Sequence, residues 1–317
     1  MAKTAAAGHE VHFVTIPGLR CWRTGRKKYR NITVHTLLPK SDKFPAAVRF
    51  YLNKQIGLQD AWLIVSNPLW APVISRVKAA GIVYDQLDHF TVHAPGGKNI
   101  PRLRSREESL LTQADAITTV SRRLQSQSPF PGKTFLLPNG VPESFLKQPL
   151  PNASPKIIGF HGALYEWIDY DLLEEIAETF PDHILRLAGT VRDHNQLRKL
   201  LLKPNVEILP AFRFEQLPEI VNSFSIGIVP FKDDEVSRCA DPLKIYEYLA
   251  LGKSVVTTVP SAAEADVVIT ATRENFCQKI SGLLSNMPSE EQCRSAASEH
   301  TWEKRCRMLL KICGGSV

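Results

Sequence analysis

The amino-acid sequence predicts an α/β protein made of two doubly wound, Rossmann-like domains. Short apolar stretches alternate with stretches of helical periodicity, and the connections between them are short. This alternation is typical of parallel sheets that are covered by helices on both faces. The length of 317 residues is large for one hydrophobic core, because single cores stop growing at roughly 250–300 residues. A proline-rich stretch without periodicity near the middle of the chain marks the expected division.

The first domain is expected to span residues 1–147 and to begin with a buried strand at 11–16. A basic loop around Trp22, residues 17–28, is expected to follow that strand. The rest of this half alternates between strands and helices. The expected strands are 62–66, 82–85, 116–120 and 134–137, and the expected helices are 72–80 and 101–113. Together these elements predict one parallel sheet.

A helix is also expected at 45–56, with Ser41 or Asp42 as its capping residue. Its charged and aromatic residues are Arg49, Lys54, Phe50 and Tyr51. A mixture of basic and aromatic residues is typical of helices that lie at a membrane surface. Packing of both aromatic side chains in the core is the other interpretation, and the sequence favours it.

The second half begins after a linker at 148–155, whose sequence is Gln-Pro-Leu-Pro-Asn-Ala-Ser-Pro. The second domain is expected at 156–300. Its first helix is expected to start at Asp169 or Asp171 and to run to Phe180. Its expected strands are 157–160, 184–188, 206–209 and 226–230. A last segment, 301–317, is expected to form a terminal helix over 302–312.

The stretch from 237 to 259 carries the clearest chemistry. Asp241 suits a helix N-cap, Pro242 suits the first helical position, and Gly252 is expected to stop the helix before a Val-Val-Thr-Thr strand. Lys244 and Glu247 are three residues apart, so they share one face of the helix. The amides and positive dipole end of a helix start suit a phosphate, and a cation beside them suits a diphosphate. The carboxylate one turn later can accept hydrogen bonds from ribose hydroxyls. The alternative is a surface helix with a salt bridge.

The pattern Pro242-x-Lys244-x-x-Glu247-Tyr248-x-Ala250-x-Gly252-x-x-Val-Val resembles the donor-binding signature of GT-B glycosyltransferases, the bacterial polysaccharide-building enzymes of family-four type. The resemblance implies two Rossmann-like domains that face each other across a cleft, with the last helix returning to the first domain. It also implies that the helix start, with Asp241, Leu243 and Lys244, holds the donor diphosphate, and that Glu247 holds the ribose. Two departures are Cys239, where the family has a glutamate, and Ser254, where it has a proline.

Other candidate site residues lie at the ends of expected strands. Gly162 follows a strand, where backbone can approach a phosphate closely; a simple tight turn is the alternative. Phe212 and Arg213 resemble the family's base-binding loop, and Phe212 suits a core position equally well. Asp88 is the candidate catalytic base, ahead of Asp85 and His89. A turn-forming role for Asp88 is the alternative.

Charge is unevenly distributed. The net charge of +7 divides into +12 for residues 1–150 and −5 for residues 151–317. A nucleic-acid partner is disfavoured, because no recognition helix or RNA-binding signature is present. An anionic membrane face, or an anionic lipid-linked acceptor, is the expected partner of the basic half, with a solvated basic surface as the alternative. The six cysteines show no metal-binding spacing and are expected to be free thiols, and no segment is long and apolar enough to span a membrane. A cytoplasmic location, on or near the inner membrane face, follows as an expectation.

The expected function is transfer of a sugar from a nucleotide-diphosphate sugar to a hydroxyl of a lipid-linked or oligosaccharide acceptor in surface polysaccharide biosynthesis. No metal or other cofactor is expected, because a helix start and a lysine already serve the phosphates. Two alternatives remain open. One is a nucleotide-sugar 2-epimerase-like enzyme, which would need further acid and base groups. The other is a nucleotide-sugar-binding protein that lost catalysis.

The start of the chain departs from the resemblance. A GT-B first domain opens with a strand, a loop that faces the cleft, and a helix that precedes the second strand. The residues before 11–16 are too few for these three elements, since a strand advances about 3.3 Å and a helix about 1.5 Å per residue. The first domain is therefore expected to lack its usual first strand, either by truncation or by adaptation.

Overall fold

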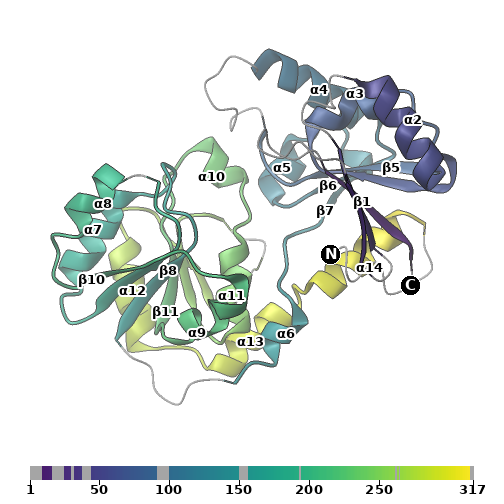
Figure 1. Cartoon of the computed structure of the whole chain (residues 1–317). Coiled ribbons are helices and arrows are strands. Elements are labelled where there is room, and N and C mark those ends of the chain that lie inside the picture. The colour runs from purple at the N-terminus through teal and green to yellow at the C-terminus, as the bar shows by residue number, and fades with distance from the viewer. Residues whose placement is uncertain are drawn as a thin grey trace. The chain divides into compact units, whose positions relative to one another are not determined.

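The structure is a computed structural model. It describes residues 9–15, 25–29, 32–37, 44–90, 100–149, 156–192, 194–260, 263 and 265–314. Its contacts divide the chain into two compact units, coloured along the chain in Figure 1. The first unit comprises Met1–Leu137 with Glu303–Val317, and the second comprises Pro138–Trp302. Residues 138–147, which were expected in the first domain, thus belong to the second unit, where Val141 and Phe145 are buried in its core. The expected linker lies largely outside the described residues.

The first unit contains a three-stranded sheet of order β1-β3-β2. Strand β3 (Ile32–Thr36) pairs in parallel with β1 (Val11–Thr15) and antiparallel with β2 (Gly25–Tyr29). The expectation of a loop at 17–28 was therefore wrong for its last four residues. The run Arg26-Lys27-Lys28 shows no apolar alternation, and its strand conformation comes from backbone pairing with β3. The expectation about a missing first strand stays a prediction, since residues 1–8 and 16–24 lie outside the described part.

A second sheet in this unit has four parallel strands in the order β4-β5-β6-β7. These are β4 (Trp62–Val65), β5 (Gly81–Gln86), β6 (Ala116–Thr119) and β7 (Thr134–Leu136). The sequence predicted all four to within two residues, because each is an apolar run bounded by turn residues. Their helices are α2 (Pro45–Ile56), α3 (Ala71–Ile74), α4 (Ile100–Gln113) and α5 (Arg122–Gln127).

Two helix expectations in this unit need correction. The helix expected at 72–80 ends at Ile74, because the chain then turns so that the Ala80 amide donates a hydrogen bond to the Ala61 carbonyl at 3.0 Å. Helix α2 begins after Phe44, whose side chain makes no capping bond. Ser41 and Asp42, the expected caps, lie outside the described residues.

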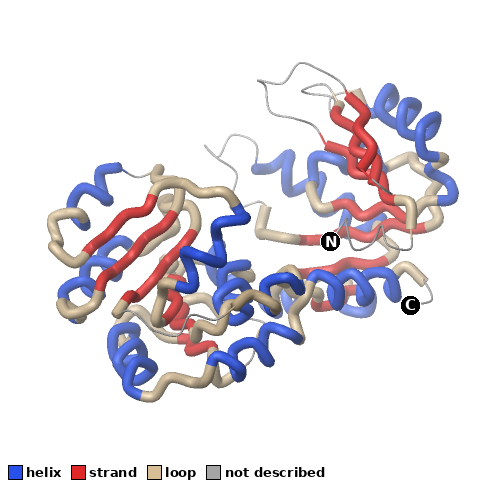
Figure 2. Tube along the Cα trace, turned by 60° about the horizontal axis from the view of Figure 1, so that its bottom comes forward, coloured by secondary structure: helices blue, strands red, loops and turns tan. Residues whose placement is uncertain are grey.

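The second unit is built on a six-stranded sheet of order β10-β9-β8-β11-β12-β13, in which every pairing is parallel. Figure 2 shows these strands as one run of red segments with helices beside them. The strands are β8 (Ile157–His161), β9 (Ile184–Ala188), β10 (Val206–Leu209), β11 (Ile226–Val229), β12 (Val255–Thr257) and β13 (Val268–Thr270). The helices are α6 (Glu143–Leu146), α7 (Tyr170–Thr179), α8 (His194–Leu200), α9 (Leu217–Asn222), α10 (Glu235–Cys239), α11 (Leu243–Ala250), α12 (Phe276–Ser285) and α13 (Glu290–Ser298).

This strand order is the doubly wound arrangement 3-2-1-4-5-6 when the strands are counted within the unit. The central strands β8 and β11 are buried along their whole length, as expected for a parallel sheet covered on both faces. Helix α7 confirms its predicted start, because the Asp169 side chain accepts a hydrogen bond from the Leu172 amide at 2.9 Å. Gly252 confirms the predicted end of α11 with a positive φ of 75°.

The terminal helix α14 (Trp302–Ile312) was predicted with the bounds that the structure shows. From Glu303 onward it belongs to the first unit, where buried Arg305 pairs with buried Asp85. Among the described residues, none of the helices has the length and apolar content to cross a membrane.

Candidate functional site

The candidate site lies where the strand order of the second unit reverses. Strands β8 and β11 are neighbours in the sheet although β9 and β10 come between them in sequence. In open parallel sheets, ligands bind beyond the carboxyl ends of the strands at such a point. The carboxyl end of β8 is His161, and Gly162 follows it.

Gly162 is held in a conformation that favours glycine. Its φ is 128°, in a region that residues with a Cβ rarely adopt. Its amide donates a hydrogen bond to the Ala188 carbonyl at 2.8 Å, which fixes the turn to the end of β9. Gly189, with a φ of 142°, packs so closely that a Cβ on it would lie 2.1 Å from the Gly162 carbonyl oxygen. Two glycines at adjacent strand ends thus keep side chains out of this position.

Lys244 occupies the space that a side chain on Gly162 would need. A Cβ on Gly162 would lie 2.4 Å from Lys244 Cε and 2.9 Å from its Nζ. The ammonium lies over two aromatic rings, 5.4 Å from the centre of Phe160 and 5.6 Å from that of Phe231. Burial lowers the pKa of Lys244, and the nearby Glu247 carboxylate opposes that shift. Within the described residues, this cation has aromatic faces beside it and a backbone turn in front of it.

Glu247 lies one turn further along α11 and is buried. Its Oε2 is 3.2 Å from Nε2 of His161, but the two atoms lack the alignment of a hydrogen bond. Burial lowers the pKa of His161 more than Glu247 raises it, so the imidazole is neutral near pH 7. The His161 amide donates to the Tyr248 hydroxyl at 3.0 Å, and the two rings meet edge to face. Lys244 and Glu247, which the spacing placed on one helix face, therefore both lie at the β8 end.

His161 and Tyr248 are site neighbours that the sequence analysis did not single out. The sequence could have pointed to His161 through its position between a buried strand and Gly162. The site begins at this position. Tyr248 is fully buried, and burial raises the pKa of its hydroxyl well above the usual range. It therefore acts as a neutral support for the turn rather than as a titrating group.

Asp241, the expected N-cap of α11, does not cap that helix. The N-cap of α11 is Pro242, and no side chain caps the helix. The buried Asp241 carboxylate instead accepts hydrogen bonds from the Asn139 amide at 2.7 Å and from the Tyr246 hydroxyl at 2.7 Å. Asn139 Nδ2 also donates to the Asp241 carbonyl at 2.7 Å. These bonds tie the Pro-Asn-Gly-Val turn to the start of α11, so Asp241 positions the helix.

The other residues that were expected to bind the donor are exposed or half-buried. Leu243 is exposed at the start of α11. Phe212 is half-buried, and its ring meets that of His161 edge to face with centroids 6.4 Å apart. Arg213 is exposed, and its backbone amide donates to Gln216 Oε1 at 3.0 Å. Phe212 is thus brought near the β8 end, whereas the Arg213 side chain is exposed.

Cys239, which stands where the family has a glutamate, is buried at the end of α10. Its thiol lies 3.6 Å from Oε1 of Glu235, one turn earlier on the same helix. A carboxylate is thus present next to position 239 even though the residue there is a cysteine.

In the first unit, Asp85 and Asp88 differ in burial and in their hydrogen-bond partners. Asp85 is buried at the end of β5, where it accepts hydrogen bonds from Arg305 Nη2 at 2.9 Å and from the Thr118 hydroxyl at 2.7 Å. Asp88 is half-buried in the following turn, and its Oδ1 accepts from the His89 amide at 2.8 Å. Both bonds are internal to the first unit, so Asp85 has a structural role. Of the two carboxylates, only Asp88 is accessible enough to meet a substrate.

No group of three or more His, Cys, Asp or Glu side chains within the described residues is arranged to hold a metal ion. The five cysteines that the structure describes are free thiols, in line with the expectation from their spacing.

The chain is similar to known glycosyltransferases in sequence and in fold. Residues 155–286 match the family described as glycosyl transferases group 1. A candidate teichuronic acid biosynthesis glycosyltransferase of Bacillus subtilis, TuaH, is 24% identical over 266 residues, which is 74% of this chain and 66% of TuaH. A glycosyltransferase structure from Rickettsia africae superposes with a TM-score of 0.70 at 14% identity, over 98% of this chain and 93% of its own. Staphylococcus aureus TarM, solved as a point mutant in complex with fondaparinux, alpha-GlcNAc-glycerol and UDP, superposes at 0.61 with 13% identity, over 86% of this chain and 59% of TarM.

These findings confirm the GT-B fold and the resemblance to bacterial glycosyltransferases of polysaccharide biosynthesis. The match to the glycosyl transferases group 1 family lies within the second unit, and Lys244, Glu247 and Gly162 are all among the matched residues. The chain spans just under two thirds of the length of TuaH and less of TarM.

Proposed function

We propose that this protein transfers a sugar from a nucleotide-diphosphate sugar to a hydroxyl of a saccharide acceptor, lipid-linked or free, during the synthesis of a surface polysaccharide. The proposal rests most on one observation: the Lys244 ammonium and the Gly162 turn meet at the carboxyl end of β8. Because residue 162 has no Cβ, a diphosphate that approaches this turn meets the Lys244 ammonium beside the backbone.

In this proposal, Lys244 and the start of α11 bind the donor diphosphate. When the sugar leaves, negative charge grows on the diphosphate, and a fixed cation with oriented backbone amides stabilises that charge. The aromatic rings of Phe160 and Phe231 hold the ammonium in place without neutralising it. In this proposal the Lys244 ammonium, rather than a metal ion, faces the donor phosphates. We therefore expect donor binding to persist in the presence of EDTA.

Glu247 is proposed to accept hydrogen bonds from the ribose hydroxyls. Its present neighbour is the neutral His161 imidazole, whose Nε2 is not aligned for a hydrogen bond with it. The carboxylate oxygens therefore keep capacity for stronger partners, since a carboxylate can accept about four hydrogen bonds. Phe212, whose ring meets His161, is proposed to contact the base, with the Arg213 backbone beside it.

Asp88 is proposed as the general base that takes the proton of the acceptor hydroxyl. It lies in the turn after β5, and the carboxyl ends of parallel strands are where substrates are bound in such sheets. The transfer would then form the new glycosidic bond from the acceptor oxygen as the bond to the diphosphate breaks, with the hydroxyl proton passing to Asp88.

The proposal is tested by thermal unfolding of the full chain in the presence of a panel of nucleotide sugars, their nucleoside diphosphates and the free nucleosides. A ligand at 100 times its dissociation constant should stabilise the protein by about 2.7 kcal/mol. Nucleotide sugars that stabilise it are then incubated with the protein and candidate acceptors, and the products are identified by mass spectrometry. If no nucleotide sugar or nucleoside diphosphate shifts the unfolding temperature, the proposed donor site is wrong.

A second candidate function is supported by Cys239, which replaces a carboxylate of the family pattern. A protein that binds a nucleotide sugar without transferring it would show the thermal shift but neither transfer nor slow hydrolysis of the bound donor. Release of free sugar from the donor in the absence of acceptor would favour the enzyme.

A further inference from the structure

The imidazole of His161 has a buried ring nitrogen that makes no hydrogen bond within the described part of the chain. This nitrogen, Nε2, lies 3.2 Å from Oε2 of Glu247, and the two side chains are only 6% and 11% exposed. Buried polar atoms in folded proteins nearly always have a partner. A buried nitrogen left unpaired beside a carboxylate therefore indicates a contact that changes with the state of the site.

The His161 ring is held in place by aromatic neighbours. It meets the Tyr248 ring edge to face with centroids 5.0 Å apart, and the Phe212 ring with centroids 6.4 Å apart. The backbone of the same residue is fixed too, because its amide donates to the Tyr248 hydroxyl. A change in the protonation of His161 would therefore alter its contact with Glu247 rather than the position of the ring.

Protonation changes what Nε2 can offer to Glu247. A neutral imidazole carries hydrogen on one of its two ring nitrogens, whereas an imidazolium carries hydrogen on both. The charged ring would thus present an N–H group to Glu247 Oε2. Hydrogen bonds between ionised groups are roughly twice as strong as neutral ones. That carboxylate oxygen would then be bonded to His161 and lost to a ribose hydroxyl.

The two charged residues of α11 act on His161 in opposite directions. Burial lowers the pKa of His161, the Glu247 carboxylate raises that pKa, and the Lys244 ammonium lowers it further. The net direction is downward from the ordinary value of 6.5. The ring is therefore neutral near pH 7 and takes up its proton only in more acidic solution.

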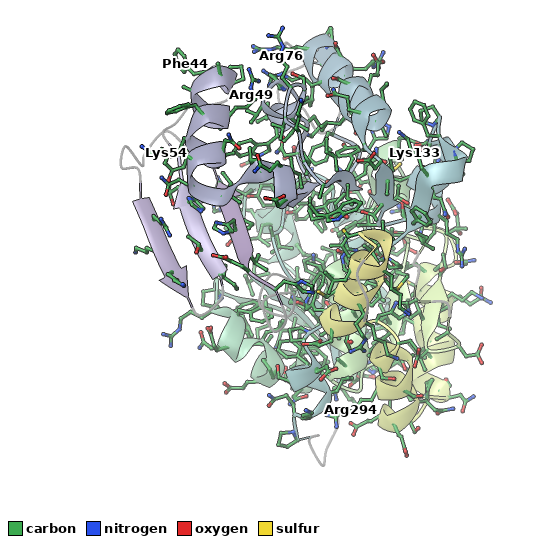
Figure 3. All side chains as sticks on the ribbon, turned by 90° about the vertical axis from the view of Figure 1, so that its right-hand side faces the viewer. Phe44, Arg49, Lys54, Arg76, Lys133 and Arg294 are labelled. Atoms are coloured by element: carbon green, nitrogen blue, oxygen red, sulfur yellow. The ribbon has the colours of Figure 1, made fainter. Side chains whose placement is uncertain are left out.

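Charged residues on the neighbouring elements have partners of their own. On β9, Arg186 pairs with Glu207 at 2.7 Å, and β11 has no charged residue. Helix α13 packs against α11. Its Glu290 lies 3.7 Å from Lys253 Nζ, and its Arg294, which Figure 3 labels near the lower edge of the view, donates to a backbone carbonyl. Among the described residues, Glu247 and Lys244 are thus the charges that act on His161.

We propose that His161 is a positioning residue for Glu247 and makes ribose binding depend on pH. With a neutral imidazole, both carboxylate oxygens of Glu247 can accept hydrogen bonds from the ribose. With a charged imidazole, Oε2 is held by His161 and the ribose loses one acceptor. The inference rests on the proposed function, because it takes the ribose of the donor to be the ligand of Glu247.

The test is titration of the full chain with uridine between pH 8 and pH 5. Uridine carries the ribose but no phosphate, and phosphates would themselves be attracted to a charged imidazole. We expect constant affinity from pH 8 to pH 7 and a fall of roughly tenfold toward pH 5, the loss of one hydrogen bond to a charged group. His161→Gln and His161→Phe cannot titrate at this position, so both should lose the acidic decrease. The second variant also keeps an aromatic ring beside Tyr248.

Nuclear magnetic resonance gives a second readout that a purely structural role would not change. The imidazole signal of His161 is identified by its absence from His161→Phe. Because linkage between proton and ligand is reciprocal, saturating uridine should move the titration midpoint of this signal to lower pH. A midpoint that is unchanged or raised by uridine would overturn the proposal.

His183 provides a matched control in the same unit. It precedes β9 and is half-buried, and burial lowers its pKa as well. His183→Gln should therefore keep the acidic decrease in uridine affinity. The proposal is overturned if this control removes the decrease, if both His161 variants retain it, or if the parent protein binds uridine equally at pH 8 and pH 5. A thermal shift with UDP at pH 8 shows that the donor site stands in such a case, and its absence would refute the donor site together with this inference.

Discussion

Lys244 and Gly162 are in contact, and the contact requires that residue 162 lack a side chain: a Cβ there would lie 2.4 Å from Lys244 Cε. Gly162→Ala would also strain the backbone, because φ is 128°. The methyl group would displace the ammonium from the strand end. With UDP as the probe nucleoside diphosphate, we expect Gly162→Ala to weaken binding by roughly tenfold or more, the loss of one charge-assisted hydrogen bond. Isothermal titration calorimetry measures this directly.

Gly282→Ala is the control for that substitution. Gly282 lies within α12, and a Cβ on it would meet nothing within 4 Å. This variant should bind UDP normally and gain about 0.5–1 kcal/mol of stability, since alanine favours a helix over glycine. Equal UDP affinity in Gly162→Ala and the parent protein would show that the diphosphate does not reach this turn.

Lys244 and Glu247 are expected to act on different parts of the donor. Lys244→Ala should weaken UDP binding and leave uridine binding nearly unchanged, because only UDP carries the diphosphate. Glu247→Ala should weaken both, because both carry the ribose. Each lost charge-assisted hydrogen bond corresponds to about 1.5–3 kcal/mol, or roughly ten- to a hundred-fold in affinity. Titration curves that coincide with those of the parent protein for both variants would contradict the assignment.

The affinity for UDP should depend on pH through Lys244. Burial lowers the pKa of this lysine below its ordinary 10.5, and a bound diphosphate favours the charged form. The free site therefore loses its proton at a lower pH than an exposed lysine, and UDP affinity should fall as the pH rises through that lowered pKa. Below that pKa Lys244 stays protonated, so its ionisation should cause no change of UDP affinity with pH.

Lys244→Arg is the comparison for the pH measurement. A guanidinium stays charged at any accessible pH, as its pKa exceeds about 12. The variant should lose the alkaline decrease that is due to residue 244, while the ionisation of the ligand itself is common to both proteins. Identical pH profiles for the variant and the parent protein would assign the decrease to another group.

The sequence predicted the central strands of the second unit well because these strands are buried on both faces. Such strands appear as continuous apolar runs, and the runs at β8 and β11 were found to within one residue. Helix α11 was predicted because Pro242 and Gly252 mark its two ends by local backbone chemistry. The spacing of Lys244 and Glu247 placed them on one face, and both do lie near the β8 end.

What the sequence could not supply were contacts between distant segments. Asp241 looked like an N-cap because of its neighbours, but its partner is Asn139, 102 residues earlier. His161 meets Glu247 only through the packing of α11 against the sheet. Strand β2 was missed because pairing with β3, rather than apolar alternation, makes it a strand. The expectation that both aromatic residues of α2 pack in the core was wrong for Phe50, which is 74% exposed, whereas the Tyr51 hydroxyl lies 3.2 Å from Nδ1 of buried His35.

Asp85 and Asp88 are only three residues apart, yet their substitution should have opposite consequences. Asp85→Asn would leave buried Arg305 without its anionic partner, and breaking a buried pair costs about 3–5 kcal/mol. Thermal unfolding should therefore shift strongly. Arg305→Met should destabilise similarly, and combining Arg305→Met with Asp85→Leu should recover part of the loss, because neither charge is then left unpaired.

Asp88→Asn should leave stability nearly unchanged, because the amide oxygen of asparagine can still accept the hydrogen bond from the His89 amide. It removes the proton acceptor, however. If Asp88 is the general base, the rate of sugar transfer should fall by roughly a hundredfold or more while UDP affinity is retained. Initial rates of transfer, measured alongside UDP titrations, separate these effects. Transfer within a few-fold of the parent rate would exclude Asp88 as the base, and it would favour a reaction that retains the anomeric configuration and needs no base at this position.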